Sequence, residues 1–469
     1  MNYLDHSVEN IKIAYIGGGS RGWAWGLMSD LVSYEDISGD VFLYDIDYDA
    51  AAKNEIIGNK FNEAEGAKSR WNYHAAHTPE EALTGADFVI ISILPGTFDE
   101  MESDVHTPEK YGIYQPVGDS TGPGGIIRAM RTVPMFEEIA ENIKKYAPKA
   151  WVINYTNPMT LCVKTLYRVF PQIKAFGCCH EVFGTQKFLR QMIEEDFGVK
   201  DVERSEIKVN PVGINHFTWI TKATWKNYDL FDYYPDFCRR RIADCKNQKG
   251  ADDNWFNRNF KTQNLVKMDL FQRFGYIAAA GDRHLAEFCE GKWYLENPER
   301  VDEMGFALTS VAWRKGDLKT RLERSERLVS GEEAVVINNT GEEGVHQMRA
   351  LLGLDELITN VNIPNVGQIP NLPMGAVVET NAVFRADSVQ PVFAGNIPES
   401  ILPLIGRICT EQEQISKGIA ERDLNAIFSA FVNDPLVTCS MKDAKKMFDE
   451  MIENTKAYLT MYADVSAGD

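Results

Sequence analysis

Residues 11–34 read IKIAYIGGGSRGWAWGLMSDLVSY, and this stretch joins an apolar run to a glycine-rich turn and then to a helical pattern. Gly17, Gly19 and Gly22 satisfy the spacing G-x-G-x-x-G. Glycines at these positions permit a tight turn and let a pyrophosphate approach the backbone N–H groups at a helix N-terminus. The spacing alone also fits a plain strand–helix turn, but its place between a strand and a helix predicts a dinucleotide site.

An acidic residue further along indicates which dinucleotide binds. Asp45 lies at the end of the second apolar run, Val41–Ile46. A carboxylate at this position accepts hydrogen bonds from the ribose hydroxyls of NAD and repels the additional phosphate of NADP. We therefore expect NAD to be the cofactor. The residues expected to bind it are Gly17, Gly18, Gly19, Ser20, Arg21 and Asp45.

The first part of the chain alternates between strand and helix patterns. Apolar runs typical of strands are Ile11–Ile16, Val41–Ile46, Phe88–Leu94, Ala150–Tyr155 and Ile173–Cys178. Helical spacing lies between them, as in Ala24–Tyr34 and Val133–Tyr146. Strands that alternate with helices predict an α/β chain with a Rossmann-type, doubly wound parallel sheet.

After Cys179 the pattern becomes mixed. The clearest stretches are a helix at Phe183–Phe197, alternating strands at Glu206–Trp225, a strand at Ala376–Phe384 and helices over Pro403–Tyr462. The stretch Ile358–Gly375 is rich in Gly, Asn and Pro, which predicts an irregular interruption. We predict an NAD-binding domain over residues 1–182 and an α+β substrate and dimerisation domain over residues 183–469, with the active site between them.

Composition excludes several classes of function. The 469 residues carry a net charge of −19, and an acidic chain repels nucleic acid and anionic lipid. No run of about twenty apolar residues occurs, and the first residues lack the pattern of a signal peptide. The 8 cysteines are scattered rather than arranged as a disulfide framework. We therefore expect a reduced, cytoplasmic protein that binds neither nucleic acid nor membranes.

Three polar clusters follow the expected strands, at Asn154–Met159, Gly177–Glu181 and Gly213–Phe217. Open α/β sheets bind ligands beyond the carboxyl ends of their strands, so we expect these clusters to converge. Cys179 and His216 are candidate metal ligands, because thiolate and imidazole bind divalent transition metals. A buried thiol and a core histidine are the ordinary alternative for either residue alone. Their occurrence at consecutive strand ends favours an open metal site completed by substrate oxygens.

A fourth cluster contains Arg283 and His284, within Gly281–His284. An arginine beside a histidine could hold a carboxylate, since the guanidinium presents a rigid fork of donors. The alternative is a surface ion pair among Asp282, Arg283 and Glu287, which would contribute little.

Together these motifs resemble glycoside hydrolase family four, over nearly the whole chain. The motifs that carry the resemblance are Gly17-Gly18-Gly19-Ser20, Thr121-Gly122-Pro123-Gly124-Gly125, Asn157-Pro158, Cys179-His180-Glu181-Val182, Asn215-His216 and Val361-Asn362-Ile363-Pro364-Asn365. The resemblance implies a fold similar to lactate and malate dehydrogenases, with NAD and usually manganese, or another divalent transition metal, as cofactors. We expect a homodimer or a homotetramer.

The resemblance also assigns ligands. Cys179 and His216 match the metal ligands of the family, and Asn157 matches a substrate-binding asparagine near the metal. Asp119 matches an acidic substrate-binding position, although this chain reads Gly118-Asp119-Ser120 where members often read Gln-Glu-Thr.

Catalytic roles follow from the same resemblance. Asp269 falls where members carry the general base, and His180 falls at the position of the general acid, where phospho-sugar members have Asp. The implied reaction begins with oxidation of the sugar at C3 by NAD and removal of the C2 proton. Elimination of the aglycone, addition of water at C1 and reduction by the same NADH complete it. This scheme differs from the two-carboxylate mechanism of most glycosidases.

Two features of the sequence indicate the substrate: an arginine of the phospho-sugar members is absent, and two other motifs match a different branch of the family. Phospho-sugar members carry an arginine at the end of the third apolar run, where this chain has Leu94 in Ser92–Thr97. The Cys-His-Glu-Val tetrad and Gly281–Phe288 instead resemble the α-galacturonidase branch, in which Arg283 and His284 would receive a uronate carboxylate. We therefore expect cleavage of α-linked uronic acids.

Other functions remain open at this point. An α-glucosidase, α-glucuronidase or α-galactosidase of the same family is the near alternative. A malate-like 2-hydroxy-acid dehydrogenase is an alternative from another class, but it needs a His–Asp pair and no metal and gives Cys179 no role. A regulatory NAD-binding protein without activity is the third.

Overall fold

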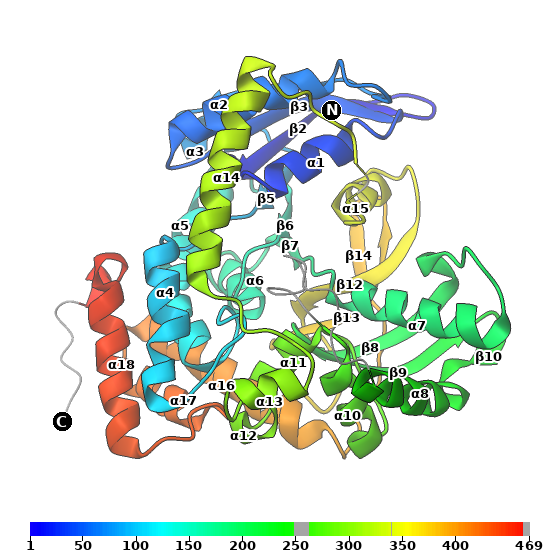
Figure 1. Cartoon of the computed structure of the whole chain (residues 1–469). Coiled ribbons are helices and arrows are strands. Elements are labelled where there is room, and N and C mark those ends of the chain that lie inside the picture. Colours follow the sequence, from blue (N-terminus) through cyan, green and yellow to red (C-terminus); the bar gives the residue numbers. More distant parts are fainter. Residues whose placement is uncertain (248–261, 339, 463–469) are drawn as a thin grey trace.

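The computed structural model describes residues 1–247, 262–338 and 340–462, and these residues form a sheet of 14 strands with helices around it (Figure 1). One half of the sheet is parallel, in the order β4-β3-β2-β5-β6-β7. Its strands are β2 (Val8–Ile16), β3 (Ile37–Tyr44), β4 (Trp71–Ala76), β5 (Phe88–Ile91), β6 (Trp151–Asn154) and β7 (Lys174–Gly177). In chain order this is the 3-2-1-4-5-6 arrangement of a Rossmann sheet, which confirms the predicted fold class.

Helices cover this half of the sheet on both faces, which explains why its central strands are continuous apolar runs. All four residues of β5 are buried, as expected for a parallel strand enclosed by helices. The covering helices are α1 (Trp23–Leu31), α2 (Tyr48–Phe61), α3 (Pro79–Leu83), α5 (Gly122–Tyr146) and α6 (Met159–Val169), whereas α4 (Phe98–His106) packs against α5 and other helices. The sequence pattern did not reveal β4, where asparagine and histidine interrupt the apolar residues.

The other half of the sheet is antiparallel and joins the first at β7. Its main strands are β8 (Ile207–Ile214), β9 (Phe217–Trp225), β12 (Leu357–Pro364) and β13 (Val377–Arg385). The prediction of an irregular stretch from Ile358 to Gly375 is wrong for its first part, because β12 pairs with both β7 and β13. The asparagines of β12 misled the prediction, since they are buried and hydrogen-bonded inside the protein.

Helices surround the antiparallel half as well (Figure 1). They are α7 (Glu181–Phe197), α8 (Tyr234–Asn247), α10 (Leu265–Phe274), α11 (Asp282–Glu287), α12 (Gly291–Tyr294) and α13 (Pro298–Glu303). The last three helices, α16 (Leu402–Glu421), α17 (Leu424–Asn433) and α18 (Met441–Thr455), pack against α5. None of the helices within the described residues is long and apolar enough to cross a membrane.

Two helices from the second half of the sequence return to the first lobe. Figure 1 shows α14 (Val311–Ser330) running alongside the lobe that holds the parallel strands, and α15 (Gly344–Leu351) lies on the other side of that lobe. Leu328 and Val345 pack in the same core as β2 and β3, and Lys60 on α2 donates to the carbonyl of Val329 at 2.8 Å. The two lobes share one sheet, and helices from the second half of the sequence pack on the first lobe. The domain boundary between residues 182 and 183 therefore stays a prediction.

Candidate active site

The glycine-rich turn has the geometry that a dinucleotide site requires. Gly17 has a φ of +91°, and a Cβ there would lie 2.0 Å from the carbonyl oxygen of Ser92. Only glycine fits this position, because both the conformation and the space exclude a side chain. Gly22 precedes α1, so the turn presents backbone N–H groups at the start of a helix.

Asp45 lies against this turn at the end of β3. Its carboxylate accepts hydrogen bonds from the backbone N–H of Gly19 at 2.8 Å and of Asp47 at 2.9 Å. Burial raises the pKa of Asp45, and these N–H donors oppose the rise. A carboxylate has about four acceptor positions, so two remain for ribose hydroxyls. The residues present fit the predicted NAD site.

We expect Asp45→Ala to weaken NAD binding by about tenfold to a hundredfold, because hydrogen bonds to a charged group are lost. Calorimetric titration with NAD and NADP measures the effect. Asp49→Ala is the matched control, since Asp49 is exposed on α2 and should leave both affinities unchanged. Tighter binding of NADP than of NAD by the unaltered chain would contradict the assignment.

Imidazole and carboxylate groups converge near the carboxyl ends of the parallel strands. Asp119, His216 and His284 each place a ligand atom within 4.8 Å of the others, an arrangement that could hold a metal ion. The rings of His216 and His284 have centroids 3.8 Å apart. Burial, and then His284, lower the pKa of His216 to about 3, which leaves the imidazole neutral and able to bind a metal.

The structure therefore brings together two predicted substrate residues and one predicted metal ligand. Burial alone would raise the pKa of Asp119, but His216, His284 and Arg128 outweigh it and lower the pKa to about 2. A carboxylate and two neutral imidazoles form a suitable ligand set for a divalent transition metal.

Cys179 is buried at the end of β7 and belongs to no such three-ligand group among the described residues. Burial raises the pKa of its thiol well above the usual value, and Glu379 and Glu181 add to the rise. Asn215, the residue before His216, lies beside it. The carbonyl oxygen of Cys179 accepts a hydrogen bond from Asn360 at 3.2 Å. Its assignment as a metal ligand stays a prediction.

Sequence reasoning gave no role to several residues that hold this cluster. Glu181 accepts the backbone N–H of Gly281 at 2.6 Å, and its other oxygen lies 3.5 Å from Nε2 of His284. Ser120 Oγ lies 3.1 Å from Nδ1 of His216. Both residues are close in sequence to predicted site residues, since Glu181 lies two residues after Cys179 and Ser120 follows Asp119 directly. Their neighbourhood was therefore visible in the sequence, although their roles were not.

Asn157 lies beside Asp119. Its amide Nδ2 donates to Asp119 at 3.1 Å, and its carbonyl Oδ1 is buried without a hydrogen-bond partner in the described parts of the chain. A buried acceptor without a partner costs stability unless a ligand satisfies it. This observation supports a ligand at the cluster.

Besides Arg128, two further guanidinium groups lie close to Asp119. Arg283 donates to the carbonyl of Pro116 at 2.7 Å, and burial followed by the charge of Arg314 lowers its pKa to about 10. Burial also lowers the pKa of Arg314, and Asp119 and Glu287 oppose this shift. Nε of Arg314 is buried and lacks a hydrogen-bond partner in the ranges that the structure covers. Arg314 comes from α14, far along the chain, and no sequence motif indicated it.

The loop that carries Asp119 is held by Glu287, which the sequence suggested only as part of a surface ion pair. That alternative is wrong, because Glu287 is fully buried and accepts the N–H groups of Val117 at 2.7 Å and Gly118 at 2.9 Å. Burial raises its pKa to about 8. Glu287 is thus largely protonated at neutral pH.

This shift predicts a pH dependence of stability. Between an ordinary value of 4.5 and about 8, the folded chain keeps a proton on Glu287 that the unfolded chain releases. The free energy of unfolding should therefore fall as pH rises through this window. In Glu287→Gln the amide is an isostere of the neutral acid, so thermal unfolding should lose less stability between pH 5 and pH 8 than the wild type. Glu299→Gln, at an exposed position, should keep the wild-type slope, and parallel curves for Glu287→Gln would contradict the assignment.

His180 is half exposed and lies between the two lobes. Its Nδ1 lies 3.1 Å from a carboxylate oxygen of Glu342, and its ring lies 6.3 Å from that of Trp23. The hydrogen bond with Glu342 raises the pKa of His180. The imidazole is accessible, as a general acid must be.

Asp269 is not part of the cluster. Its carboxylate accepts hydrogen bonds from Tyr294 at 2.6 Å and from Arg273 at 2.7 Å. Both Asp269 and Arg273 reach solvent, with a quarter of the Asp269 side chain exposed. The prediction that Asp269 is the base therefore rests on the family resemblance and not on a contact with the cluster.

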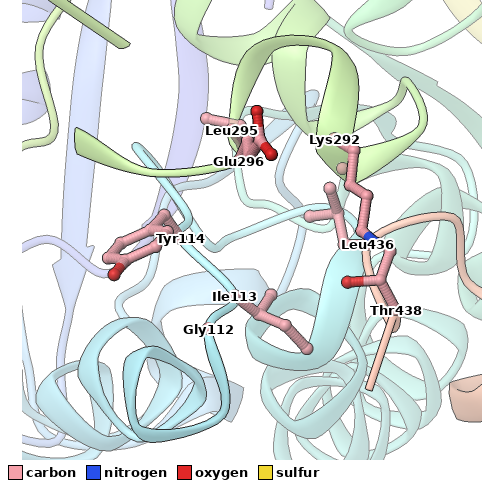
Figure 2. Close-up of a pocket in the computed structure, with 9 residues that line it drawn as sticks. Gly112, Ile113, Tyr114, Lys292, Leu295, Glu296, Leu436 and Thr438 are labelled. Carbon is pink, nitrogen blue, oxygen red and sulfur yellow. The ribbon is translucent and has the colours of Figure 1, made fainter. Parts of the chain in front are cut away.

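A small crevice is lined by residues that come a few positions before Asp119 in the sequence and by parts of two later segments. Figure 2 shows it between Ile113, Tyr114, Lys292 and Leu436. Its volume of about 50 Å³ is enough for one or two waters, not for a sugar ring. The cluster at Asp119 is thus the better candidate for the catalytic centre.

A dinucleotide-type turn, together with imidazoles and carboxylates at the strand ends of the same sheet, defines an α/β enzyme of the dinucleotide-dependent class. Sequence comparison then gives the family. The chain belongs to the family 4 glycosyl hydrolases: the family's first domain matches residues 12–195 and its C-terminal domain matches residues 211–437. The protein is therefore a glycosidase, and the dehydrogenase alternative is not favoured.

Individual relatives agree. The chain is 61% identical over 459 residues to an α-galacturonidase of Thermoanaerobacterium saccharolyticum, a match that covers 98% of both chains. The crystal structure of a Bacillus subtilis protein named as a candidate glucosidase superposes with a TM-score of 0.89 at 49% identity, covering 95% of this chain and all of that one. A 6-phospho-β-glucosidase of Thermotoga maritima, solved with manganese, NAD+ and glucose-6-phosphate, has a TM-score of 0.75 at 22% identity, over 96% and 99% of the two chains. This last likeness supports the fold.

Proposed function

We propose that this glycosidase is an α-galacturonidase that requires NAD and a divalent metal such as manganese. The observation that carries the uronide specificity is the pair of partly buried guanidiniums, Arg283 and Arg314, beside Asp119. Two neighbouring cations in a chain of net charge −19 favour an anionic group between them. The α-galacturonidase relative at 61% identity supports the same substrate.

This pair of arginines favours a sugar carboxylate as the anionic group. A phosphate would need a cation at the position where phospho-sugar enzymes carry an arginine, and this chain has none there. Leu94, which stands in place of their arginine, offers no charge and is 42% exposed. The planar fork of a guanidinium matches a carboxylate, and it keeps its charge at any physiological pH. His284 lies next to Arg283 and faces His216, so the bound sugar would lie across the cluster.

The residues divide the work as follows. The turn from Gly17 to Arg21, together with Asp45, would hold NAD, which supplies reversible hydride transfer. A metal would stabilise negative charge on sugar oxygens. The candidate ligands for it are Cys179, His216, Asp119 and His284. Asn157 orients the substrate through its unpartnered oxygen. Asp269 would remove the C2 proton, and His180 would protonate the leaving group. A homodimer or homotetramer remains a prediction.

The test is selectivity between acid and neutral sugars. We expect the wild type to hydrolyse α-D-galacturonides far better than matching α-galactosides or α-glucosides, and to leave phosphorylated glucosides intact. Arg283→Ala and Arg314→Ala should each lower kcat/KM for the galacturonide by about tenfold to a hundredfold, because a charge-assisted hydrogen bond is lost. Activity on the neutral sugar should change little.

Lys319→Ala is the matched control, since Lys319 is exposed on the same helix as Arg314. Equal losses on both classes of sugar would make the arginines structural. A wild type that prefers neutral α-glucosides or α-galactosides would reject the uronide proposal in favour of another member of the family.

A further inference from the structure

One face of α14 lines a cavity of about 370 Å³. The lining residues are Trp313, Gly316, Asp317 and Thr320. Their spacing of three, four and seven residues places them on one side of the helix. The volume falls within the range of sites that bind small ligands, roughly 300–1,000 Å³.

Residues at the two ends of this face of α14 reach the two ligand sites already described. At one end of this face, Arg314 follows Trp313 and its charge interacts with Asp119. At the other end, Arg321 donates to the carbonyl of Arg21 in the dinucleotide turn at 3.0 Å. Any ligand on this face would therefore lie next to the sugar held at the Asp119 cluster.

The chemistry of the face suits a sugar ring. Trp313 supplies an aromatic surface, and most of the exposed lining is apolar. The Asp317 carboxylate lies on the same face, as does the Thr320 hydroxyl, which donates weakly to the carbonyl of Gly316 at 3.4 Å. Asp317 also accepts from Arg321 at 2.6 Å, which fixes its position and offsets its charge. An apolar surface with a few oriented polar groups is typical of small-molecule sites, and a pyranose has both a C–H face and hydroxyls.

Gly316 is the most informative residue of the four. It lies inside a 20-residue helix, where glycine is less favourable than alanine. A Cβ at this position would meet no atom within 4 Å, so packing within the described chain does not require glycine. The missing side chain keeps the surface between Trp313 and Thr320 open.

We propose that this face of α14 is the subsite for the leaving-group sugar of an oligosaccharide substrate. The proposal rests on the proposed function, because it places the second ring next to the uronate held near Arg283 and Arg314. Trp313 would contact the face of that ring, and Asp317 and Thr320 would bind its hydroxyls.

Gly316→Leu tests the subsite with little risk to folding. The Cβ of the new side chain meets no atom within 4 Å, and leucine favours the helix more than glycine does. The substrates to compare are digalacturonide and α-D-galacturonyl fluoride, whose leaving group is one atom. We expect kcat/KM for the disaccharide to fall by about tenfold to a hundredfold, since the leaving sugar is excluded, while the fluoride is cleaved as by the wild type. Trp313→Ala should raise KM for the disaccharide in the same selective way.

Lys319→Leu is the control, because it adds the same side chain at an exposed position of α14 outside the cavity lining. Equal losses on disaccharide and fluoride in Gly316→Leu would overturn the proposal, and so would an unchanged disaccharide rate. A raised Kd for NAD in calorimetry, with the fluoride affected as well, would assign the face to the cofactor instead. If the wild type cleaves neither galacturonide, the proposed function fails. The matching pair of α-galactosyl or α-glucosyl substrates, whichever is cleaved, then tests the subsite by the same criterion.

Discussion

His216→Ala should lose its bound metal and at least about three orders of magnitude in turnover, because stabilisation of charge by a metal contributes several kcal/mol and each 1.4 kcal/mol is about tenfold. His216 belongs both to the ligand pair that the sequence predicts and to the group of three that the structure shows. Metal content by mass spectrometry and kcat on a galacturonide measure the two effects. Metal removal from the wild type by a chelator should reproduce the loss, and manganese should reverse it.

A variant of Cys179 distinguishes the metal-ligand pair predicted from the sequence, Cys179 and His216, from the group of three that the structure brings together. We expect Cys179→Ser to lose metal as well, since thiolate binds a transition metal better than a hydroxyl does. Cys178→Ser is a matched control, because Cys178 is the adjacent buried thiol and lies beside Tyr155 rather than near His216. If Cys179→Ser keeps its metal while Asp119→Asn and His284→Gln lose it, the ion is held by the group of three. Full activity of the wild type in chelator would remove the metal from the reaction.

Asp269→Asn should lower kcat by about two to four orders of magnitude while substrate binding is retained, because this is the usual contribution of a positioned base. Wild-type turnover in heavy water should place deuterium at C2 of the product sugar, and the variant should lose that exchange together with turnover. Deuterium incorporation is measured by NMR and binding by calorimetry.

Arg273→Ala separates a catalytic role from a structural one. Arg273 pairs with Asp269 but is 60% exposed, and exposed ion pairs contribute little to stability. Near-normal turnover in Arg273→Ala, with the loss confined to Asp269→Asn, would support a catalytic role. If Asp269→Asn turns over normally, or if its loss follows a lowered melting temperature, the base is another residue. Tyr276, near α10 in sequence, and Tyr294, which donates to Asp269, are then the first to test.

The parallel half of the fold was predictable because its signals are local. The dinucleotide turn follows directly from the order strand, glycine turn, helix, and all five predicted strands of this lobe occur within a few residues of their expected bounds. Asp45 was found by the same logic, because it ends the neighbouring strand. The strand that was missed, β4, has polar Asn72 and His74 between its apolar residues, so it lacks the continuous apolar run by which the other parallel strands were found.

The site was predictable only in part. Asn157 and His216, from two of the strand-end clusters, lie together with Asp119, which the family resemblance assigned, and with His284, from the fourth polar cluster. Asp269 does not lie with them, since its carboxylate is held by Arg273 of the same helix, α10, and by the buried Tyr294 of α12, neither of which belongs to the cluster. A motif identifies the position of a residue in the sequence. The direction in which the side chain of Asp269 points depends on how its helix, α10, packs.

The sequence by itself determined the family, the dinucleotide turn and the strand ends at which chemistry occurs, because these depend on residues within a few positions of one another. Only the tertiary structure decided that β12 joins the two halves of the sheet, that Glu287 is buried behind the Asp119 loop, and that α14 places Arg314 beside that loop. These contacts join residues roughly 170 to 200 positions apart. Such pairs leave no periodicity and no motif in the chain, since they form only when the apolar faces of distant elements pack and carry their polar side chains with them.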